Sequence, residues 1–484
     1  MNSYKKIIKT TGVIGIVQVF KLFFGFLQNK VLAIIVGPSG IGIWGLYNSL
    51  VQLVSSFSTL GIDQAGVKQI SQNEGDEKKI SDTIWVFKNS ILLLSIISVL
   101  IIITFSNNIS ILLFGNESYG IGIIIVSFAV LFNSFNQGQI SILNGFSEIK
   151  KIAKSQIYGA IGGGLFAILF VVLYKEKGIP FFILGLSFIS AFFSWKYVKK
   201  RRISSVRPSF SIIKKEFLVL FSIGIGIAYS AIIVAIMTYL MQIYIRKEFG
   251  LNILGIYNAS FTISNIYIGV ILSAMGVDLM PRLSKIIENK KLVNKMVNDQ
   301  MELGLLIASI GIVCILLFSP IILSILYSNE FSDGKNIIRW QILGVFLRVL
   351  AFPLGYILII KKKTLQFVIV QTVMWCGNYF FLIVLTNLWG VDILGLNYFI
   401  SYIIYVLVLF IFTKKEMVVS NKLKRVFIFS SFFIICSWLI TNYLSFYYMV
   451  FFGGLLIFAN LYWVISYLKN EMDINVISLL KLKK

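Results

Sequence analysis

Histidine is absent from this 484-residue sequence, and charged residues are scarce, at 13% of the chain. The missing histidine excludes imidazole metal ligands, imidazole general bases and the side chain that proton relays commonly use. A soluble protein has about a quarter of its residues charged, so this chain has too few charges to cover a water-exposed surface. The composition therefore excludes an ordinary soluble enzyme.

Cysteine is also rare. The three cysteines, Cys314, Cys376 and Cys436, lie in apolar runs and lack the spacing of metal ligands. We interpret them as small core residues rather than as disulfide partners. The sequence predicts no cofactor, no metal and no catalytic residue.

Long apolar runs make up most of the chain, which is 58% hydrophobic. About 20 apolar residues in a helix cross a bilayer. By this measure the runs predict fourteen spans, at residues 11–36, 40–62, 84–105, 120–142, 156–174, 181–198, 217–244, 253–275, 301–326, 337–360, 364–386, 396–413, 425–444 and 447–468. The predicted fold class is an all-α polytopic membrane protein with about 14 transmembrane helices.

The distribution of basic residues predicts the orientation. Of the 44 Lys and Arg residues, 34 lie in segments that share one side of the membrane with both termini. Basic residues accumulate on the cytoplasmic side of membrane proteins. We therefore expect both termini in the cytoplasm, and we interpret the clusters at 199–202 and 361–363 as membrane anchoring rather than nucleic-acid binding.

An internal repeat is visible in two short matches. "WGLYNSL" (44–50) resembles "LGIYNAS" (254–260), and "LGID" (60–63) resembles "MGVD" (275–278). The matches open and close spans that are six apart, which predicts parallel repeats unless they arose by chance. The expected architecture is two six-helix lobes, residues 1–216 and 217–424, around a central cavity, with two additional helices and a basic cytoplasmic tail in 425–484.

Two basic residues lie deep inside predicted spans. Lys21 and Arg348 are each near the middle of an apolar run, whereas Lys30 and Lys88 are close enough to span ends to reach the interface. A charge at mid-span costs about 2.5–3.5 kcal/mol even on a lenient scale. No Asp or Glu lies deep in any predicted span. Backbone carbonyls, cavity water or an anionic substrate could each accommodate the two cations.

Polar side chains on neighbouring spans extend this pattern. The candidate substrate-binding residues beside Lys21 and Arg348 are Gln18, Asn133, Gln137, Tyr47, Tyr257 and Asn258. Hydrogen bonds between helices would explain many of them without a ligand. The glycine run at 159–166 lies inside a span with no strand before it, which favours close helix packing over a phosphate loop.

The chain resembles the oligosaccharide (O-antigen) flippase family, the polysaccharide-exporter branch of a superfamily that also contains multidrug extruders and the lipid II flippase. The resemblance covers about residues 8–420 and is weaker in the last two spans. The motifs that carry it are "VGPSGIGIWGLYNSL" (36–50), "LGIDQAGVKQISQ" (60–72), "LNGFSEIKKIAKSQI" (143–157), "MPRLSK" (280–285) and "IIRWQILGVFLRVLAFPLGYILIIKKKT" (337–364).

The resemblance implies a flippase that moves undecaprenyl-diphosphate-linked oligosaccharides from the cytoplasmic to the outer leaflet by alternating access, for O-antigen, capsule or exopolysaccharide assembly. Lys21 and Arg348 would hold the diphosphate while the prenyl tail stays in lipid. It further implies a monomer in the bacterial cytoplasmic (inner) membrane, in contact with membrane lipids, a polysaccharide polymerase and chain-length machinery.

Three other functions remain to be weighed. A multidrug or cation antiporter would need acidic residues in its cavity, where this chain offers basic ones. A lipid II-type peptidoglycan precursor flippase is the closer alternative, although the motifs favour the oligosaccharide branch. A membrane enzyme would need a catalytic carboxylate pair, and Asp63, Asp278 and Glu148 form no recognisable pair.

Overall fold

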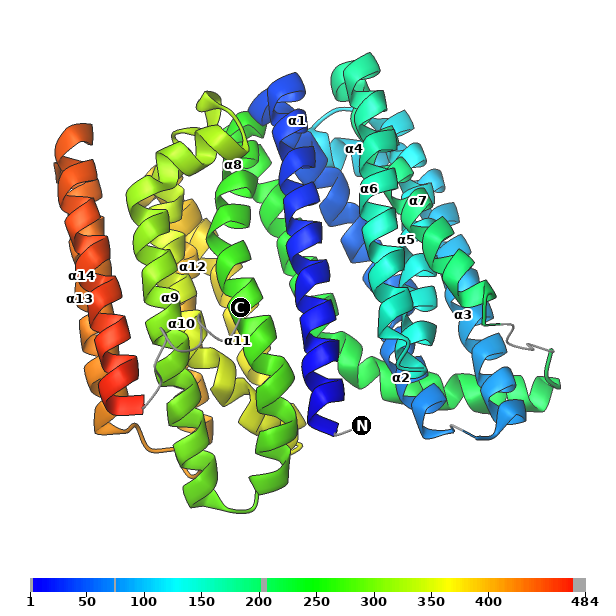
Figure 1. The fold of residues 1–484 in the computed structure, drawn as a ribbon. Helices are drawn as coiled ribbons and strands as arrows, with labels where there is room; N and C mark the ends of the chain where they lie inside the picture. The colour runs from blue at the N-terminus through cyan, green and yellow to red at the C-terminus, as the bar shows by residue number, and fades with distance from the viewer. Residues whose placement is uncertain (1–2, 74, 202–206, 473–484) are drawn as a thin grey trace. The chain divides into compact units, whose positions relative to one another are not determined.

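A computed structural model describes residues 3–73, 75–201 and 207–472 of the protein. Side chains are described from Phe20 onward, apart from residues 21, 227, 274, 277, 278, 281 and 446. The described helices are α1 (Ser3–Thr59), α2 (Ile62–Gln72), α3 (Glu77–Thr104), α4 (Ser106–Phe114), α5 (Gly120–Gly145), α6 (Ile149–Tyr174), α7 (Ile179–Lys199), α8 (Phe210–Ile286), α9 (Lys290–Leu326), α10 (Gly334–Ile360), α11 (Thr364–Trp389), α12 (Ile393–Thr413), α13 (Asn421–Tyr443) and α14 (Phe446–Met472) (Figure 1).

Ten segments of the described chain are helical, long and apolar enough to cross a membrane. Four of these have 38 to 51 residues, and each contains a break, at Gly37, Lys175–Gly178, Gly250 or Gly390–Asp392. Division at the four breaks gives the fourteen spans that the sequence predicts. The all-α polytopic fold class is confirmed.

The breaks in α1 and α8 depend on glycine. Gly37 has φ 64° and ψ −167°, and Gly250 has φ 82° and ψ 173°. This region of backbone conformation is open essentially to glycine alone, because a Cβ would clash with the backbone. The two glycines are 213 residues apart and each precedes the first repeat match, so both repeats turn back at the same point.

A second turn also recurs. Ser147 after α5 and Lys362 after α10 are 215 residues apart, and both have φ 55°. The amide of Ser147 donates to the carbonyl of Asn144 at 2.8 Å, and that of Lys362 donates to Ile359 at 3.1 Å. The shared backbone conformation supports the internal repeat that the sequence predicts.

The chain forms two compact units. Unit 1 contains Met1–Asn258 and Leu326–Glu330, and unit 2 contains Ala259–Ile325 and Phe331–Lys484. The division falls inside α8, later than the predicted lobe boundary at residue 216. Compactness and sequence repetition are different criteria, so the predicted lobes remain a prediction.

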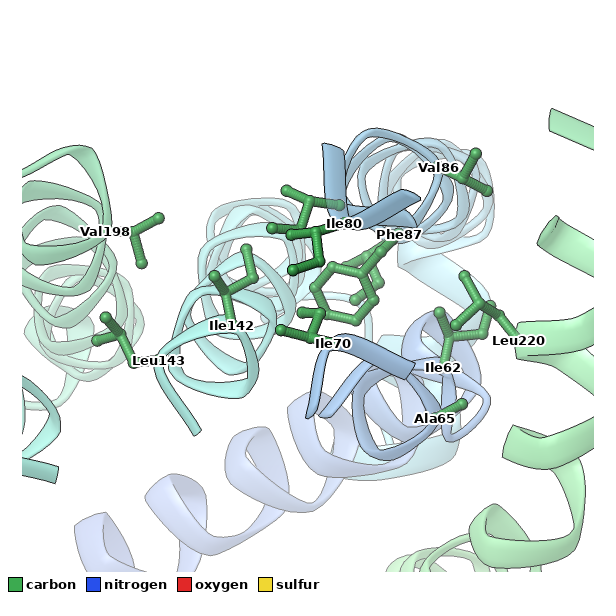
Figure 2. Close-up of a cluster of buried hydrophobic side chains, with 12 residues drawn as sticks. Ile62, Ala65, Ile70, Ile80, Val86, Phe87, Ile142, Leu143, Val198 and Leu220 are labelled. Carbon is green, nitrogen blue, oxygen red and sulfur yellow. The ribbon is translucent and has the colours of Figure 1, made fainter. Parts of the chain in front are cut away.

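In unit 1, the helices α3, α5, α6 and α7 run side by side (Figure 1). At one end, α2 packs on α3 and α5 through a cluster of buried aliphatic residues. Figure 2 shows the ring of Phe87 from α3 directed at Ile70 of α2. Gly66 lies against the same ring, because a Cβ at Gly66 would come within 2.6 Å of it.

Lipid-facing residues are clearest on α14 of unit 2. Tyr447, Phe451, Phe458 and Tyr462 are each more than 60% exposed, and their spacing places them on one helical face. Large exposed apolar faces of this kind are stable in lipid and not in water. The exposure pattern agrees with the membrane class.

An acidic residue outside the spans anchors the turn after α12. The Glu416 carboxylate accepts from Lys361 Nζ at 3.1 Å and from Lys363 Nζ at 3.2 Å. Burial by itself would raise the pKa of Glu416, but the two lysines outweigh it and hold this pKa below its ordinary value. In unit 1, Glu148 pairs with Lys151 and Arg201 after α5 and α7.

Candidate functional site

Arg348 lies in the middle of α10, with its guanidinium held by an amide of α8. Its Nη1 donates to Asn265 Oδ1 at 2.9 Å. The hydroxyl of Tyr398 on α12 donates to the same oxygen, also at 2.9 Å. Asn265 in turn donates to the carbonyl of Phe261 at 3.0 Å, which fixes the amide orientation. One edge of the guanidinium is therefore positioned by a fully bonded asparagine.

A row of tyrosines on α12 completes the surroundings of Arg348. Tyr398, Tyr402 and Tyr405 are four and three residues apart, so they share one helical face. Their ring centroids are 4.8 and 5.6 Å apart along the row. The hydroxyl oxygens of such a row stabilise a nearby cation without neutralising it.

Arg348 has no acidic partner in the part of the chain that the structure describes: no Asp or Glu there forms an ion pair with it. A guanidinium has five N–H donors, and the contacts with Asn265 and the Tyr398 hydroxyl use only part of them. The site therefore keeps a net positive charge and free donors, a combination that suits an anion.

The same arginine lines a cavity within unit 2. The cavity has a volume of about 430 Å³ and is lined by Gly269, Leu272, Ser273 and Gly276 of α8 and by Arg348, Phe352 and Tyr356 of α10. At 1.5 Å per residue, Arg348 is about 18 Å and Tyr356 about 6 Å from the end of α10. The cavity thus extends from mid-helix toward the helix end that the predicted orientation places in the cytoplasm.

Two glycines give the cavity its shape. A Cβ at Gly276 would approach the Tyr356 hydroxyl to 2.7 Å, so this glycine permits close packing of α8 on α10. A Cβ at Gly269 would meet no described atom within 4 Å. Gly269 therefore leaves open space where a side chain would fill the cavity.

The internal repeat supplies a neutral counterpart of the Arg348 contact. Asn133 on α5 precedes Arg348 by 215 residues, and Ser55 on α1 precedes Asn265 by 210 residues, the two offsets of the sequence repeat. Asn133 Nδ2 donates to Ser55 Oγ at 3.3 Å in unit 1. With these two offsets the contacts correspond, and only the contact in unit 2 includes a charged side chain. Packing alone does not require that charge.

The other predicted site residues have varied positions. The side chains of Lys21 and Gln18 lie outside the described residues. Tyr47 is 1% exposed, with its ring 5.0 Å from that of Phe114, and Tyr257 is 7% exposed. Both tyrosines are covered by protein, so direct contact with a substrate would require movement.

The remaining two predictions lie in unit 1. Asn258 exchanges hydrogen bonds with Gln242 at 2.6 and 3.3 Å, in the role of a helix-packing residue. Gln137 is half-buried on α5. All of these residues belong to unit 1, whereas Arg348 belongs to unit 2, and the whole predicted set remains a prediction.

Sequence reasoning missed the tyrosine row. The sequence does show a helical spacing of Tyr398, Tyr402 and Tyr405. Tyrosines are common near the ends of membrane helices, however, so this spacing did not indicate a site. Nothing local to α12 indicates that its tyrosines face Arg348, because the contact joins residues 50 and more positions apart in the chain.

These observations define a polytopic membrane protein in which, among the described residues, a cation without an acidic partner lines a cavity inside the spans. The chain belongs to the polysaccharide biosynthesis protein family, whose sequence model matches residues 31–336. A family model that covers this much of the chain places it in the superfamily that the motifs indicate.

Individual relatives agree with this membership. The chain is 24% identical over 366 residues to the lipid III flippase of Escherichia coli (strain K12), covering 73% of this chain and 85% of the relative, and it matches the Shigella flexneri lipid III flippase equally. Its fold is similar to that of the lipid II flippase MurJ in an inward closed conformation, with a TM-score of 0.72, 16% identity and coverage of 96% of this chain and 100% of that chain. An inward-facing multidrug resistance MATE family transporter gives a TM-score of 0.69 at 14% identity, covering 85% and 98%.

Proposed function

We propose that this protein translocates a polyprenyl-diphosphate-linked oligosaccharide from the cytoplasmic to the outer leaflet of the bacterial inner membrane, by alternating access, for assembly of O-antigen or another surface polysaccharide. The uncompensated Arg348 guanidinium in the unit 2 cavity carries the proposal. Family membership and the lipid III flippase relative support it.

The chemistry of the cavity fits a diphosphate. Arginine donors match phosphate oxygens in paired geometry, and charge-assisted hydrogen bonds are about twice as strong as neutral ones. Because few waters screen charges between helices, an arriving diphosphate would be attracted more strongly than in bulk water. Lys21 is the second proposed contact, from the first span.

The predicted topology suits loading from the cytoplasm. With both termini inside, the cavity next to Arg348 extends toward the cytoplasmic ends of α8 and α10. Lipid-linked precursors are presented there, while their prenyl chains remain in the leaflet. The proposed partners are therefore the lipid-linked substrate and membrane lipids, followed by the polymerase and chain-length proteins that would use the product.

A lipid II-type flippase is the second candidate, because the similarity to the lipid II flippase MurJ spans 96% of this chain. Both cargoes are lipid-linked sugars joined through a diphosphate, so Arg348 would serve either one. The 24% identity to the lipid III flippase favours the oligosaccharide cargo, since the likeness to MurJ is one of fold.

Complementation tests the proposal and separates the two cargoes. The wild-type gene should restore surface polysaccharide in a strain that lacks its oligosaccharide flippase, and should not rescue growth of cells depleted of their lipid II flippase. Arg348→Ala and Lys21→Ala should each lower export at equal membrane expression. Normal export by both variants would overturn the proposed cationic site, and rescue of only the lipid II strain would reassign the cargo.

A further inference from the structure

A second cavity lies within unit 1, between α1, α5, α6 and α7. Its volume is about 260 Å³, and it is lined chiefly by uncharged polar side chains, those of Gln28, Asn136, Ser155, Gln156 and Ser190. No Lys, Arg, Asp or Glu belongs to this lining. Unlike the cavity at Arg348, it offers amide and hydroxyl groups that both donate and accept hydrogen bonds.

Most of these polar groups are unused. Gln28 Nε2 donates to the carbonyl of Ala160 at 3.2 Å, which ties α1 to α6. Among the described residues, the side chains of Asn136, Ser155, Gln156 and Ser190 have no hydrogen-bond partner. Polar groups between membrane helices are costly when unsatisfied, so four free ones around one cavity indicate that a polar ligand or water satisfies them.

Glycines of the run on α6 pack against two of the residues that line this cavity. A Cβ at Gly164 would lie 2.3 Å from Gln28 Nε2, and a Cβ at Gly159 would lie 3.1 Å from Ser190 Oγ. These glycines therefore let α1 and α7 approach α6 closely and present Gln28 and Ser190 to the cavity. The predicted packing role of this run is confirmed, and the packing positions the polar groups.

Three of the four helices, α5, α6 and α7, place the cavity at a similar depth. Asn136 is about 14 Å from the end of α5, Ser155 about 9 Å from the start of α6, and Ser190 about 14 Å from the end of α7, at 1.5 Å per residue. These helix ends are the ones that the predicted orientation places in the cytoplasm. On these three helices the lining residues lie between the predicted cytoplasmic ends and the middle of the membrane.

We propose that this cavity binds an uncharged, hydroxyl-rich group, namely a sugar ring of the lipid-linked glycan. The inference rests on the proposed function. A sugar ring presents hydroxyls that donate and accept, which matches three amides and two hydroxyls. A bare monovalent cation would use only the acceptors and would leave most of the space empty. The cavity is smaller than the usual ligand pocket of about 300–1,000 Å³, so a whole oligosaccharide would not fit in it.

Binding measurements on the purified protein in lipid nanodiscs test the inference. The probes are undecaprenyl diphosphate without sugar and the same carrier bearing the cognate oligosaccharide. The pocket variants are Gln156→Leu, which removes an amide, and Gly25→Leu, which fills the cavity from a glycine whose Cβ would meet no described atom within 4 Å. Gly454→Leu on α14 is the matched control, because its Cβ also meets no atom within 4 Å and it lines neither cavity.

The wild type and the control should bind the glycosylated carrier about tenfold more tightly than the bare one, as expected for two added neutral hydrogen bonds. The pocket variants should lose this preference, keep their affinity for the bare carrier and retain wild-type melting temperatures. Arg348→Ala should weaken both probes equally.

Three results would overturn the inference. The first is a wild type with no preference for the glycosylated carrier. The second is a pocket variant that keeps the preference. The third is a melting temperature that depends on sodium in the wild type but not in the pocket variants, when these variants still prefer the glycosylated carrier. Failure of the wild type to bind either carrier would instead refute the proposed function, together with the inference that rests on it.

Discussion

The contact between Asn265 and Arg348 in unit 2 includes a charge, whereas the contact between Ser55 and Asn133 in unit 1 is neutral. Replacing the first pair by the second tests whether Arg348 serves packing or cargo binding. The double variant Asn265→Ser with Arg348→Asn reproduces at 265 and 348 the side chains that stand at 55 and 133. Because the neutral pair already forms this contact within unit 1, the double variant should fold. It lacks the cation and also the Asn265 amide, which accepts a hydrogen bond from the Tyr398 hydroxyl.

The expected change in stability is small. The guanidinium at mid-span costs about 2.5–3.5 kcal/mol on the insertion scale. Its bond to the Asn265 amide offsets about 1.5–3 kcal/mol of that, the range for a hydrogen bond to a charged group. These two contributions nearly cancel, and loss of the Tyr398–Asn265 bond costs about 1 kcal/mol. The double variant should therefore be within about 1 kcal/mol of the wild type in stability.

The expected change in cargo binding is large. Two charge-assisted hydrogen bonds from Arg348 to a diphosphate would contribute about 3 kcal/mol or more. Their loss should weaken binding of undecaprenyl diphosphate roughly 100-fold. The single variant Arg348→Lys keeps a charge without the planar fork and should fall between the two.

The assay combines a melting curve in detergent with carrier binding in nanodiscs and with surface polysaccharide in a flippase-null strain. A double variant that melts like the wild type but neither binds nor exports supports a cargo-binding role for Arg348. Normal export would refute the reasoning. A melting temperature lowered by many degrees would also refute the reasoning, because Arg348 would then be needed for packing in unit 2 and the neutral pair of unit 1 could not replace it.

Three further outcomes are expected. Gly269→Leu fills the unit 2 cavity without a clash and should reduce surface polysaccharide at equal expression, whereas Gly454→Leu should not. Gly37→Ala should destabilise the protein in denaturant by about 1–3 kcal/mol, because Gly37 has a conformation open essentially to glycine, whereas helical Gly454→Ala should be neutral or stabilising. Glu416, whose pKa is lowered when folded, should stabilise the protein above the unfolded carboxyl pKa of about 4.3 and stop doing so as pH falls through the lowered value. The melting temperature of the wild type should therefore exceed that of Glu416→Gln at pH 7 and converge with it as the pH falls below the lowered pKa.

Hydropathy predicted the spans because lipid requires an apolar composition in each crossing, but it underestimated the length of helices that extend beyond the membrane. The structure begins α9 at Lys290, eleven residues before the predicted span, since the helix continues through polar residues outside the apolar run. The short helices α2 and α4 were not predicted. They are 11 and 9 residues long and cannot cross a membrane, so hydropathy carries no signal for them.

The candidate site was predictable in its charge and not in its partners. Arg348 is recognisable because a cation in an apolar run is expensive wherever it occurs. Its contacts with Asn265 and Tyr398 join positions 83 and 50 residues away, and only the packing of α8, α10 and α12 determines them. The cavity beside it depends on the absence of a side chain at Gly269, which no local pattern indicates.

The two repeats can be compared contact by contact, and this comparison separates what folding requires from what a ligand requires. The backbone has kept its special conformations in both halves, at Gly37 and Gly250 and at Ser147 and Lys362. These positions are therefore constrained by folding. The polar contact between equivalent helices is also kept, but it is neutral as Ser55–Asn133 and cationic as Asn265–Arg348. A charge that costs free energy to bury, and that the equivalent contact in unit 1 omits, is best explained by an anionic ligand that Arg348 binds.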